Sequence, residues 1–476
     1  MPHVKYFLFC GILGFLVSCT LSMPEQELTE HILPTPSLDA SLAAALENRF
    51  FTKDQWPAKN WWVGYGSDEL NNLMEIALKN NPTIERISQR IQFAKSQATI
   101  ARSKLLPLLF FDASDQWQHL SKSGLYRALN PDITINPNLI DFSLSFSYEF
   151  DFWGKYRNLY EAAIGQQKAA ISETAQAELI TATALAQSYF ALKTNFIRQD
   201  LYKQLYEVRQ AYFNLQTKML HNSLYSKLPP LLSEEKVFEA AQWVYDIEQE
   251  IAVGKHVLNT LAGRGPDELL ELDDILPQLP KQLAIPTDIS TELLSRRPDL
   301  MAQIWRVDAL AHEVGAAKAN FWPSINLTAL AGFESTSWSK IFEWASKTFG
   351  MIPGLRLPLY TAGAIGANVS AKKAQFLEAV YEYNELILTS FQQVANLFAI
   401  GKAVYEKKEK QLQIVANATE RYNLTRLLQR QGIDSALNSY ELLEEQIHMQ
   451  LTDIELLYEQ YLVSVHLIKA LGGGYF

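Results

Sequence analysis

The side chains in this sequence that could bind a metal ion or transfer a proton include eight histidines and the Asp and Glu carboxylates. His312-Glu313 begins like the helical motif of zinc proteases, but Ala316 stands where that motif has its second histidine. The remaining histidines show no metal-ligand spacing: His3, His31, His119, His221, His256, His448 and His466. The spacing of the carboxylates singles out no catalytic acid and base. We therefore predict no metal ion, no cofactor and no enzymatic activity.

The two cysteines, Cys10 and Cys19, both lie near the N-terminus. The rest of the sequence therefore has no thiol for a disulfide, a thiolate metal site or a cysteine nucleophile. Lys5 is followed by an apolar run that ends at Val17, and small residues come after it. A basic start, a short apolar core and a small-residue cleavage site are typical of a secretory signal peptide, which we place at 1–18.

The residues around the predicted cleavage site suggest lipidation. Leu16-Val17-Ser18-Cys19 resembles the bacterial lipobox, in which a peptidase cuts before a cysteine that carries diacylglycerol and, after further acylation, palmitate. Cys19 is the one cysteine that would survive cleavage, although a signal peptide with an incidental cysteine is the alternative. Thr20 in place of aspartate is compatible with sorting to the outer membrane. Residues 19–54 then form a predicted lipidated, irregular tether.

Composition limits the kinds of partner. The 476 residues have a formal net charge of −10, whereas phosphate binding needs a basic face, so nucleic acid is not an expected partner. After the first twenty residues no apolar run reaches the roughly 20 residues that a membrane-spanning helix needs. If this chain crosses a membrane, it must therefore use strands.

Two segments, at 90–107 and 306–323, resemble each other and are followed by similar sequence. Both end in a proline that precedes strand-like residues. Further on, Trp153-Gly154 and Ala362-Gly363 each close a second strand and open a long helical stretch. The order helix, strand, loop, strand, long helix, turn, helix thus occurs twice, which predicts a duplication. We assign a first repeat to 55–265, a linker to 266–290 and a second repeat to 291–476.

Four segments are predicted as strands, and the clearest is FSLSFSYEFDF at 142–152. Its apolar residues alternate with serines and acids, so one face of the strand is wholly apolar and the other polar. Each segment has about the 9–11 residues of a tilted membrane strand. The other three segments lie at about 107–118, 323–334 and 351–361, and aromatic residues near the strand ends resemble interfacial girdles: Trp117, Trp153, Trp322 and Tyr360.

Four strands raise the question of how their edges are paired. A soluble sandwich is the alternative to a membrane sheet, but the rest of the chain is nearly all helical and supplies no further strands. Closed membrane barrels need about 8 strands, and an open edge cannot face lipid. A membrane location therefore requires several copies of the chain to share one barrel.

Two stretches are predicted as very long helices. Between Lys155 and about Leu220 there is no proline and a single glycine, and apolar residues recur at three- and four-residue steps. A helix of roughly 65 residues would be about 100 Å long. A similar stretch runs from about Gly366 to Gln431, and turns near Pro229-Pro230 and Gly432 close the two hairpins.

The last helix has a seven-residue apolar repeat, which implies left-handed supercoiling against its neighbours. Gly472-Gly473-Gly474 ends this helix. An ordinary coiled coil with a structural role would account for the helices but not for the four strands. The repeat consists of Ile447, Leu451, Ile454, Tyr458, Tyr461, Val465 and Ile468.

Several further motifs are specific when taken together: Trp61-Trp62 followed by SDELNNLMEIALKNNP, Arg296-Arg297-Pro298-Asp299, GAAKANFWPSINLTALAGFES at 315–335, LRLPLYTAG at 355–363 and ALGGG at 470–474. With them, the sequence from about residue 55 to its end resembles the TolC-like outer-membrane efflux proteins. The resemblance is strongest to the lipoprotein branch that serves resistance-nodulation-division drug pumps.

The resemblance implies a mainly α fold with a membrane β portion. Each copy of a homotrimer would lend four strands to a shared twelve-stranded outer-membrane barrel, and long helices would continue it as a coiled-coil cylinder through the periplasm. The implied function is a channel that passively conducts drugs and other toxic small molecules. The implied partners are a periplasmic adaptor protein, an inner-membrane pump and outer-membrane lipid.

The hairpin tips are where this sequence departs from the family pattern. The first tip reads SLYSKLPPLLSEE in place of a glycine-containing turn, and two prolines make it stiffer, which leaves adaptor docking there open. Family members often have acidic residues at a narrow periplasmic aperture. The candidates here are Glu420, Arg426, Arg430 and Asp434, which form either a charged gate or solvated charges on a helix face.

Two other functions compete with a drug channel. A periplasmic coiled-coil lipoprotein with a scaffolding role would not need the alternation at 142–152. A duct for protein secretion would share the fold, but the lipobox and the Arg296–Asp299 motif favour drug efflux.

Overall fold

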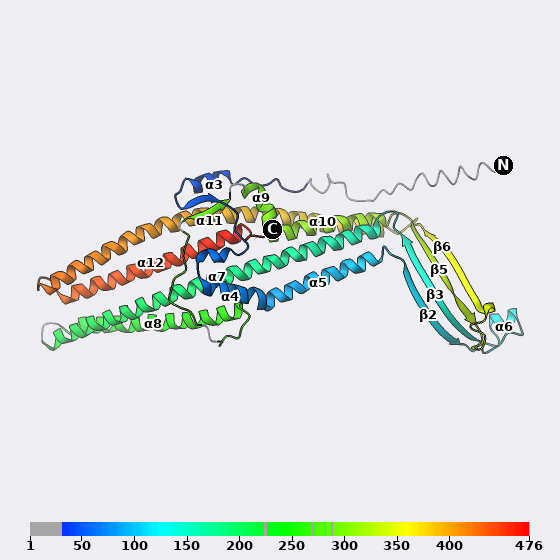
Figure 1. The fold of residues 1–476 in the computed structure, drawn as a ribbon, viewed down its shortest axis with the longest axis horizontal. Coiled ribbons are helices and arrows are strands. Elements are labelled where there is room, and N and C mark those ends of the chain that lie inside the picture. The colour runs from blue at the N-terminus through cyan, green and yellow to red at the C-terminus, as the bar shows by residue number, and fades with distance from the viewer. Residues whose placement is uncertain (1–30, 223–225, 269–270, 281, 287–288, 476) are drawn as a thin grey trace. The chain divides into compact units, whose positions relative to one another are not determined.

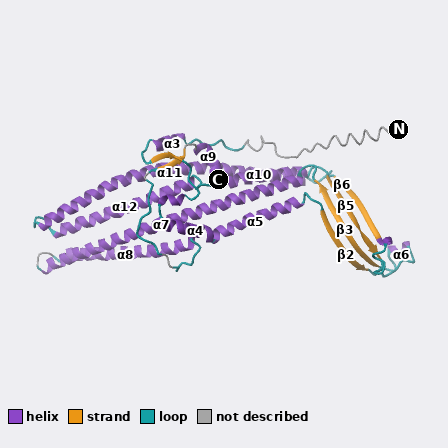
Figure 2. Ribbon diagram, viewed as in Figure 1, coloured by secondary structure: helices purple, strands orange, loops and turns teal. Residues whose placement is uncertain are grey.

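The computed structural model describes residues 31–222, 226–268, 271–280, 282–286 and 289–475 (Figure 1). The predicted signal peptide and Cys19 lie outside the described residues. Most of the described chain is helical, with one four-stranded antiparallel sheet and one two-stranded parallel sheet (Figure 2). The chain divides into two compact units, one containing 91–170 and 303–383, the other 33–90, 171–302 and 384–476.

The same order of elements occurs in both halves of the chain. The first half contains α5 (Pro82–Ser103), β2 (Leu108–Trp117), α6 (Leu125–Leu129), β3 (Asn138–Phe150), α7 (Lys155–His221) and α8 (Leu228–Leu261). The second half contains α10 (Pro298–Ala319), β5 (Ser324–Ser335), η2 (Trp344–Ser346), β6 (Lys347–Arg356), α11 (Ala364–Arg430) and α12 (Ala436–Ala470). Because α5 and α10 have 22 residues each and α7 and α11 have 67 each, the predicted duplication gains support from element lengths.

The larger sheet has the strand order β2-β3-β5-β6, and every neighbouring pair is antiparallel. β3 begins four residues before the predicted start, because residues 138–141 continue the ladder with the end of β2. β6 occupies Lys347–Arg356 and not the predicted 351–361. The leucine alternation that suggested the later range continues past the last paired residue, and Pro358 has no N–H to donate to a ladder.

Both long helices have bounds close to those predicted. A residue with positive φ precedes each of them, Gly154 before α7 and Gly363 before α11. The Asp151 carboxylate accepts the backbone N–H groups of Tyr156 and Arg157, which satisfies two donors that the first turn of α7 leaves free. Among the described residues, no helix combines the length and the apolar character that crossing a membrane requires.

The first hairpin tip lies close to Pro229 and Pro230. Pro229 and Pro230 lie in the first turn of α8, where a missing N–H costs no hydrogen bond, and not in the turn itself. The connecting residues precede them, and 223–225 lie outside the described part of the chain. The second tip contains Gly432 with φ 76°, as a helix-ending turn requires.

The second unit has a core built by short helices against the hairpins. Helix η1 (Trp61–Tyr65) and helix α4 (Asp68–Asn80) pack on α7, α8 and α12 through a cluster that includes Tyr65, Phe190 and Tyr461. Of the predicted heptad in α12, four residues are buried and three are partly buried, so the apolar seam faces its neighbours: Ile447, Leu451, Tyr461 and Val465, then Ile454, Tyr458 and Ile468.

The segment before the first repeat is more regular than the predicted tether. Helix α3 (Asp39–Leu46) is followed by strand β1 (Phe51–Asp54), which pairs in parallel with β4 (Leu283–Pro286) of the linker. Helix α9 (Ile289–Arg296) follows β4. A four-residue strand is too short to show a recognisable sequence period, and its partner is distant in the chain. The sequence alone therefore did not predict it.

Candidate functional site

The sheet of the first unit has one apolar and one mainly polar face. Alternation along each strand and the observed register bring the apolar residues of all four strands onto the same side. This apolar face has no cover over much of its area, since the side chains of Phe111, Phe349 and Met351 are 68%, 87% and 71% exposed. Its other members include Leu109, Phe142, Leu144, Phe146, Tyr148, Leu327, Ala329, Ala331, Phe333 and Leu355.

The opposite face of the sheet has hydroxyl, amide and carboxylate groups. Ser145 Oγ donates to Asp112 Oδ2 at 2.6 Å across β3 and β2. Tyr156 Oη, at the start of α7, donates to Glu149 Oε2 at 2.8 Å. The two faces therefore suit two different surroundings, one apolar and one aqueous.

Both edges of the sheet are open. β2 pairs only with β3, and β6 only with β5, among the described strands. Each edge strand thus has a row of backbone N–H and C=O groups that a further strand could bind. A single copy of the sheet therefore has an uncovered apolar face and two edges that are unpaired among the described strands.

Aromatic side chains lie at both ends of the sheet. At the end next to the helices, Trp153 and Trp322 stack with ring centroids 4.8 Å apart, and Trp153 Nε1 donates to the Pro323 carbonyl at 2.7 Å. Tyr360, just beyond β6, is 90% exposed. Trp117 ends β2 at the opposite end of the sheet and is also exposed. These are the four residues that the sequence suggested as girdle residues.

Three of the four candidate aperture residues lie on α11, and the fourth lies in the turn that follows it. Glu420, Arg426 and Arg430 are exposed on the last turns of α11, and no ion pair joins any of them to another described residue. Asp434 lies in the turn, where it accepts the Ser435 N–H and the Asn438 side-chain amide at 2.7 and 2.8 Å. The contacts of Asp434 therefore stabilise the turn that begins α12. The charged groups of the other three residues have no ion-pair partner among the described residues.

A buried arginine links the two hairpins. Arg209 of α7, 5% exposed, donates to Glu444 of α12 at 2.9 Å and to Glu239 of α8 at 2.7 Å. Its guanidinium also lies over the Trp243 ring. Burial raises the pKa of Glu444, but His448, Arg209 and Lys236 outweigh this and lower that pKa to about 2.

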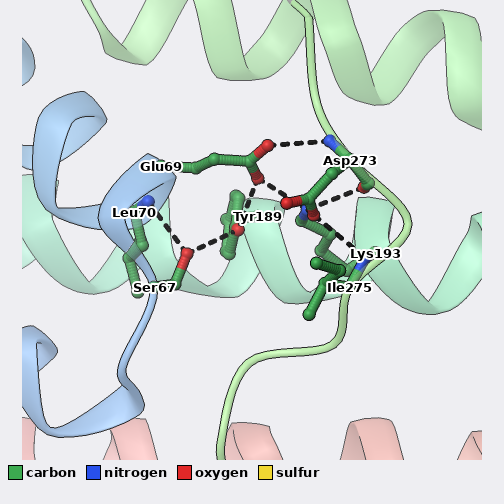
Figure 3. A network of polar contacts seen from close by, with 7 residues as sticks. All are labelled: Ser67, Glu69, Leu70, Tyr189, Lys193, Asp273 and Ile275. Carbon is green, nitrogen blue, oxygen red and sulfur yellow. Dashed lines mark hydrogen bonds and ion pairs between the residues drawn. The ribbon is translucent and has the colours of Figure 1, made fainter.

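A buried lysine binds the linker to α7 (Figure 3). Lys193 Nζ lies 2.6 Å from Glu69 Oε2 and 2.5 Å from Asp273 Oδ1, and its side chain is 1% exposed. Tyr189 Oη donates to the same Glu69 oxygen, and Ser67 Oγ caps α4 by accepting the Leu70 N–H. Hydrogen bonds from Lys193 and from the Ile275 N–H lower the pKa of Asp273.

Two of the sequence motifs form one packed joint in the second unit. Arg297 makes a bidentate pair with Asp299 and also donates to the Ala470 carbonyl at 3.2 Å. A Cβ at Gly472 would collide with the Arg296 carbonyl, so glycine is required there. Sequence analysis found the motifs but neither Arg209 nor Lys193, whose one local signal is a charged residue within an apolar helical stripe.

Helix α8 presents an exposed apolar stripe with a seven-residue spacing. Leu231, Phe238 and Tyr245 follow one another at this interval and are 49%, 62% and 70% exposed. A heptad stripe on a helix face is a typical packing surface for another helix.

Comparison with known proteins gives consistent relatives. A sequence model described as outer membrane efflux protein matches residues 73–222 and 289–473. Multidrug resistance outer membrane protein MdtP of Escherichia coli strain K12 is 27% identical over 508 residues, which cover 99% of this chain and 97% of that protein. The Campylobacter jejuni CmeC outer membrane channel has the same fold, with a TM-score of 0.83, 22% identity and coverage of 96% and 95%. The outer membrane protein VceC of Vibrio cholerae has a TM-score of 0.78, 26% identity and coverage of 88% and 100%. The family resemblance predicted from the motifs is confirmed.

Proposed function

Because the chain belongs to the outer membrane efflux protein family, we propose that it is the channel subunit of a tripartite efflux system. In this proposal an inner-membrane pump and a periplasmic adaptor deliver drugs and other toxic small molecules, and the channel conducts them passively to the exterior. The name of the relative MdtP, a multidrug resistance outer membrane protein, supports small toxic substrates. A non-enzymatic role agrees with this membership, since the compared proteins are described as outer-membrane proteins and channels.

The observation that carries the proposal is the open sheet with its apolar face. In the order β2-β3-β5-β6 the strand direction alternates, so the last strand of one copy runs antiparallel to the first strand of the next. Copies can therefore join edge to edge without a parallel pair. Three copies would close a twelve-stranded barrel whose apolar face meets lipid and whose polar face lines water.

The helical hairpins extend the proposed homotrimer into the periplasm. The exposed stripe on α8 supports helix-to-helix contact between copies, because Leu231, Phe238 and Tyr245 would otherwise remain in water. A lipid on Cys19 would hold the N-terminal segment at the outer membrane. Scaffolding alone, the competing role, would leave the apolar sheet face without a partner.

We place the proposed aperture at the end of α11. Arg426 and Arg430 are one turn apart and exposed, with Glu420 further back along the helix. When several copies meet, these like charges would approach one another and either repel or pair with acids of a neighbour. Solvated charges on a helix face are the alternative role.

Planar-bilayer conductance of the detergent-purified full-length protein tests the channel, with its mass measured in the same preparation. We expect a trimer and discrete, long-lived pores. Replacing Arg426 and Arg430 by alanine should increase the frequency or size of the openings if these residues restrict the aperture.

The double variant Lys407→Ala/Lys410→Ala removes two charges from the same helix away from its end and should leave the pores unchanged. A monomer that gives no pores, even with Arg426 and Arg430 replaced, would contradict the channel and leave the scaffold.

A further inference from the structure

The loop between β5 and β6 folds back over the apolar face of the sheet. Phe342 of this loop stacks on Phe142 with ring centroids 5.8 Å apart and meets the edge of Phe333 at 6.0 Å. Trp338 packs against Phe142, and its Nε1 donates to Asp115 Oδ2 at 3.2 Å. Both strand phenylalanines belong to the apolar face, so the loop covers that face at the end of the sheet opposite the helices.

The covering loop exposes more aromatic surface than it buries. The side chains of Trp338, Phe342 and Trp344 are 57%, 74% and 83% exposed. We call these three residues the aromatic shelf. Large aromatic side chains at the end of an apolar sheet face are typical of the boundary between hydrocarbon and headgroups.

Next to the shelf lies the ammonium of Lys347, which has no anionic partner among the described residues. Register and alternation place Lys347 opposite Phe333, on the apolar face with Phe349. Its ammonium lies against the Trp344 ring. Among the described residues of this face, Lys347 and Asp115 are the two charged side chains, and the Asp115 carboxylate already binds Trp338. No carboxylate in the described chain forms an ion pair with Lys347.

We propose that Lys347 and Trp344 form a binding site for the phosphate of a lipid headgroup, whose acyl chains lie along Phe349 and Met351. An unpaired ammonium at the rim of an apolar face lowers its free energy by reaching the nearest anionic layer, and lipid phosphates supply that layer. The ammonium lies beside the Trp344 ring and pairs with no carboxylate of the described chain, so its N–H groups can donate to a headgroup phosphate.

The site takes a lipid and not a free phosphate ion, because its surroundings are apolar. Phe349 is 87% and Met351 71% exposed, and both continue along the strand from Lys347. A soluble anion would gain the lysine contact alone, whereas a lipid also covers these side chains. This inference rests on the proposed function, since it requires the sheet to lie in the outer membrane.

Quenching of tryptophan fluorescence by brominated lipids tests the site in proteoliposomes of the full-length protein. Brominated phosphatidylglycerol in phosphatidylcholine is compared with the reverse mixture, and the Trp344→Phe variant isolates the signal of Trp344. We expect about a fivefold preference for phosphatidylglycerol near Trp344, as one lysine at an anionic surface provides. Lys347→Gln should abolish the preference, and Lys347→Arg should retain it.

Lys122→Gln is the matched control, because it removes the same charge from the loop between β2 and β3 at the same end of the sheet. An equal loss of preference with Lys122→Gln, or no loss with Lys347→Gln, would overturn the site. Displacement of the lipid by inorganic phosphate would also overturn it. Conductance measured in the same vesicles separates the two hypotheses. Pores without a lipid preference would contradict the site. The absence of both pores and quenching, with either lipid, would contradict membrane insertion itself.

Discussion

At the scale of single residues, two buried cations hold together elements of the second unit. Lys193 and Arg209 are 1% and 5% exposed, and each contacts two acids from elements distant in sequence. Removing one partner of such a pair leaves an uncompensated charge, which is costly in a poorly solvated place. Lys193 thereby determines where the linker lies on α7, and Arg209 determines how α12 lies beside α7 and α8.

The Glu444→Gln substitution should destabilise this unit by about 1–3 kcal/mol at pH 7, less than the full pKa shift implies, because part of the carboxylate faces solvent. The pKa of Glu444 in the folded protein, about 2, lies below the ordinary value of 4.5. Its stabilising contribution is therefore complete above pH 4.5 and is lost as the pH falls toward 2. The difference in urea midpoint between the variant and the wild type, followed by circular dichroism, should be large at pH 7 and reduced to about half at pH 3.

The adjacent Glu445→Gln substitution is the control for that measurement. Glu445 pairs with Arg421, but the two side chains are 40% and 51% exposed, so the loss should stay below about 1 kcal/mol. Equal effects of the two substitutions, or a Glu444→Gln effect independent of pH, would show that the Arg209 pair is not what stabilises the contact.

At the scale of elements, the sequence predicted those helices and strands that a local apolar period reveals. The limits of α7 and α11 were close to those found, because each helix lacks proline and has a glycine turn before it. The range of β6 was wrong, since alternation shows which face a residue takes but not where pairing ends. β1 and the Lys193 network depend on partners far away in the chain, and no local pattern reveals those.

Gly332 provides a test of how closely β3 and β5 approach each other. A Cβ at this position would lie 2.6 Å from Ser143 Cα and collide with the Phe142 carbonyl, so Gly332→Ala should cost about 1–3 kcal/mol. Gly350→Ala is the matched control, because its Cβ would meet nothing closer than Leu330 Cγ at 3.7 Å. Gel mobility after heating to successive temperatures should show the assembled form lost earlier with Gly332→Ala alone. Identical heat resistance of both variants would mean that β3 and β5 can move apart at Gly332 without a loss of stability.

At the scale of the whole molecule, the proposed pore forms only when several copies assemble, because a single copy does not enclose it. The edge strands β2 and β6 are the surfaces at which copies would meet. In a closed barrel the strands are staggered, so the register between β6 and the β2 of the next copy is not fixed by the register within one copy. That register can be measured directly.

Cysteine pairs across this junction should form disulfides between copies. Met351→Cys is combined in turn with Leu109→Cys, Phe111→Cys or Ala113→Cys, all on the apolar face. We expect one combination to give covalent dimers and trimers on non-reducing gels, because directly opposed strand residues have Cβ atoms about 4.5–5.5 Å apart. Met351→Cys with Phe146→Cys on the inner strand β3 should give none. Monomers from all three edge combinations would refute edge-to-edge pairing.

The central ladder of the sheet also determines when the sheet can form. Phe142 of β3 pairs with Phe333 of β5, so the two middle strands are separated by roughly 190 residues of chain. During secretion the hairpin of β2 and β3 emerges first and must wait, with its apolar face uncovered, until most of the remaining polypeptide has been translocated. We therefore expect a newly exported chain to pass through an aggregation-prone stage before its apolar strands find their partners.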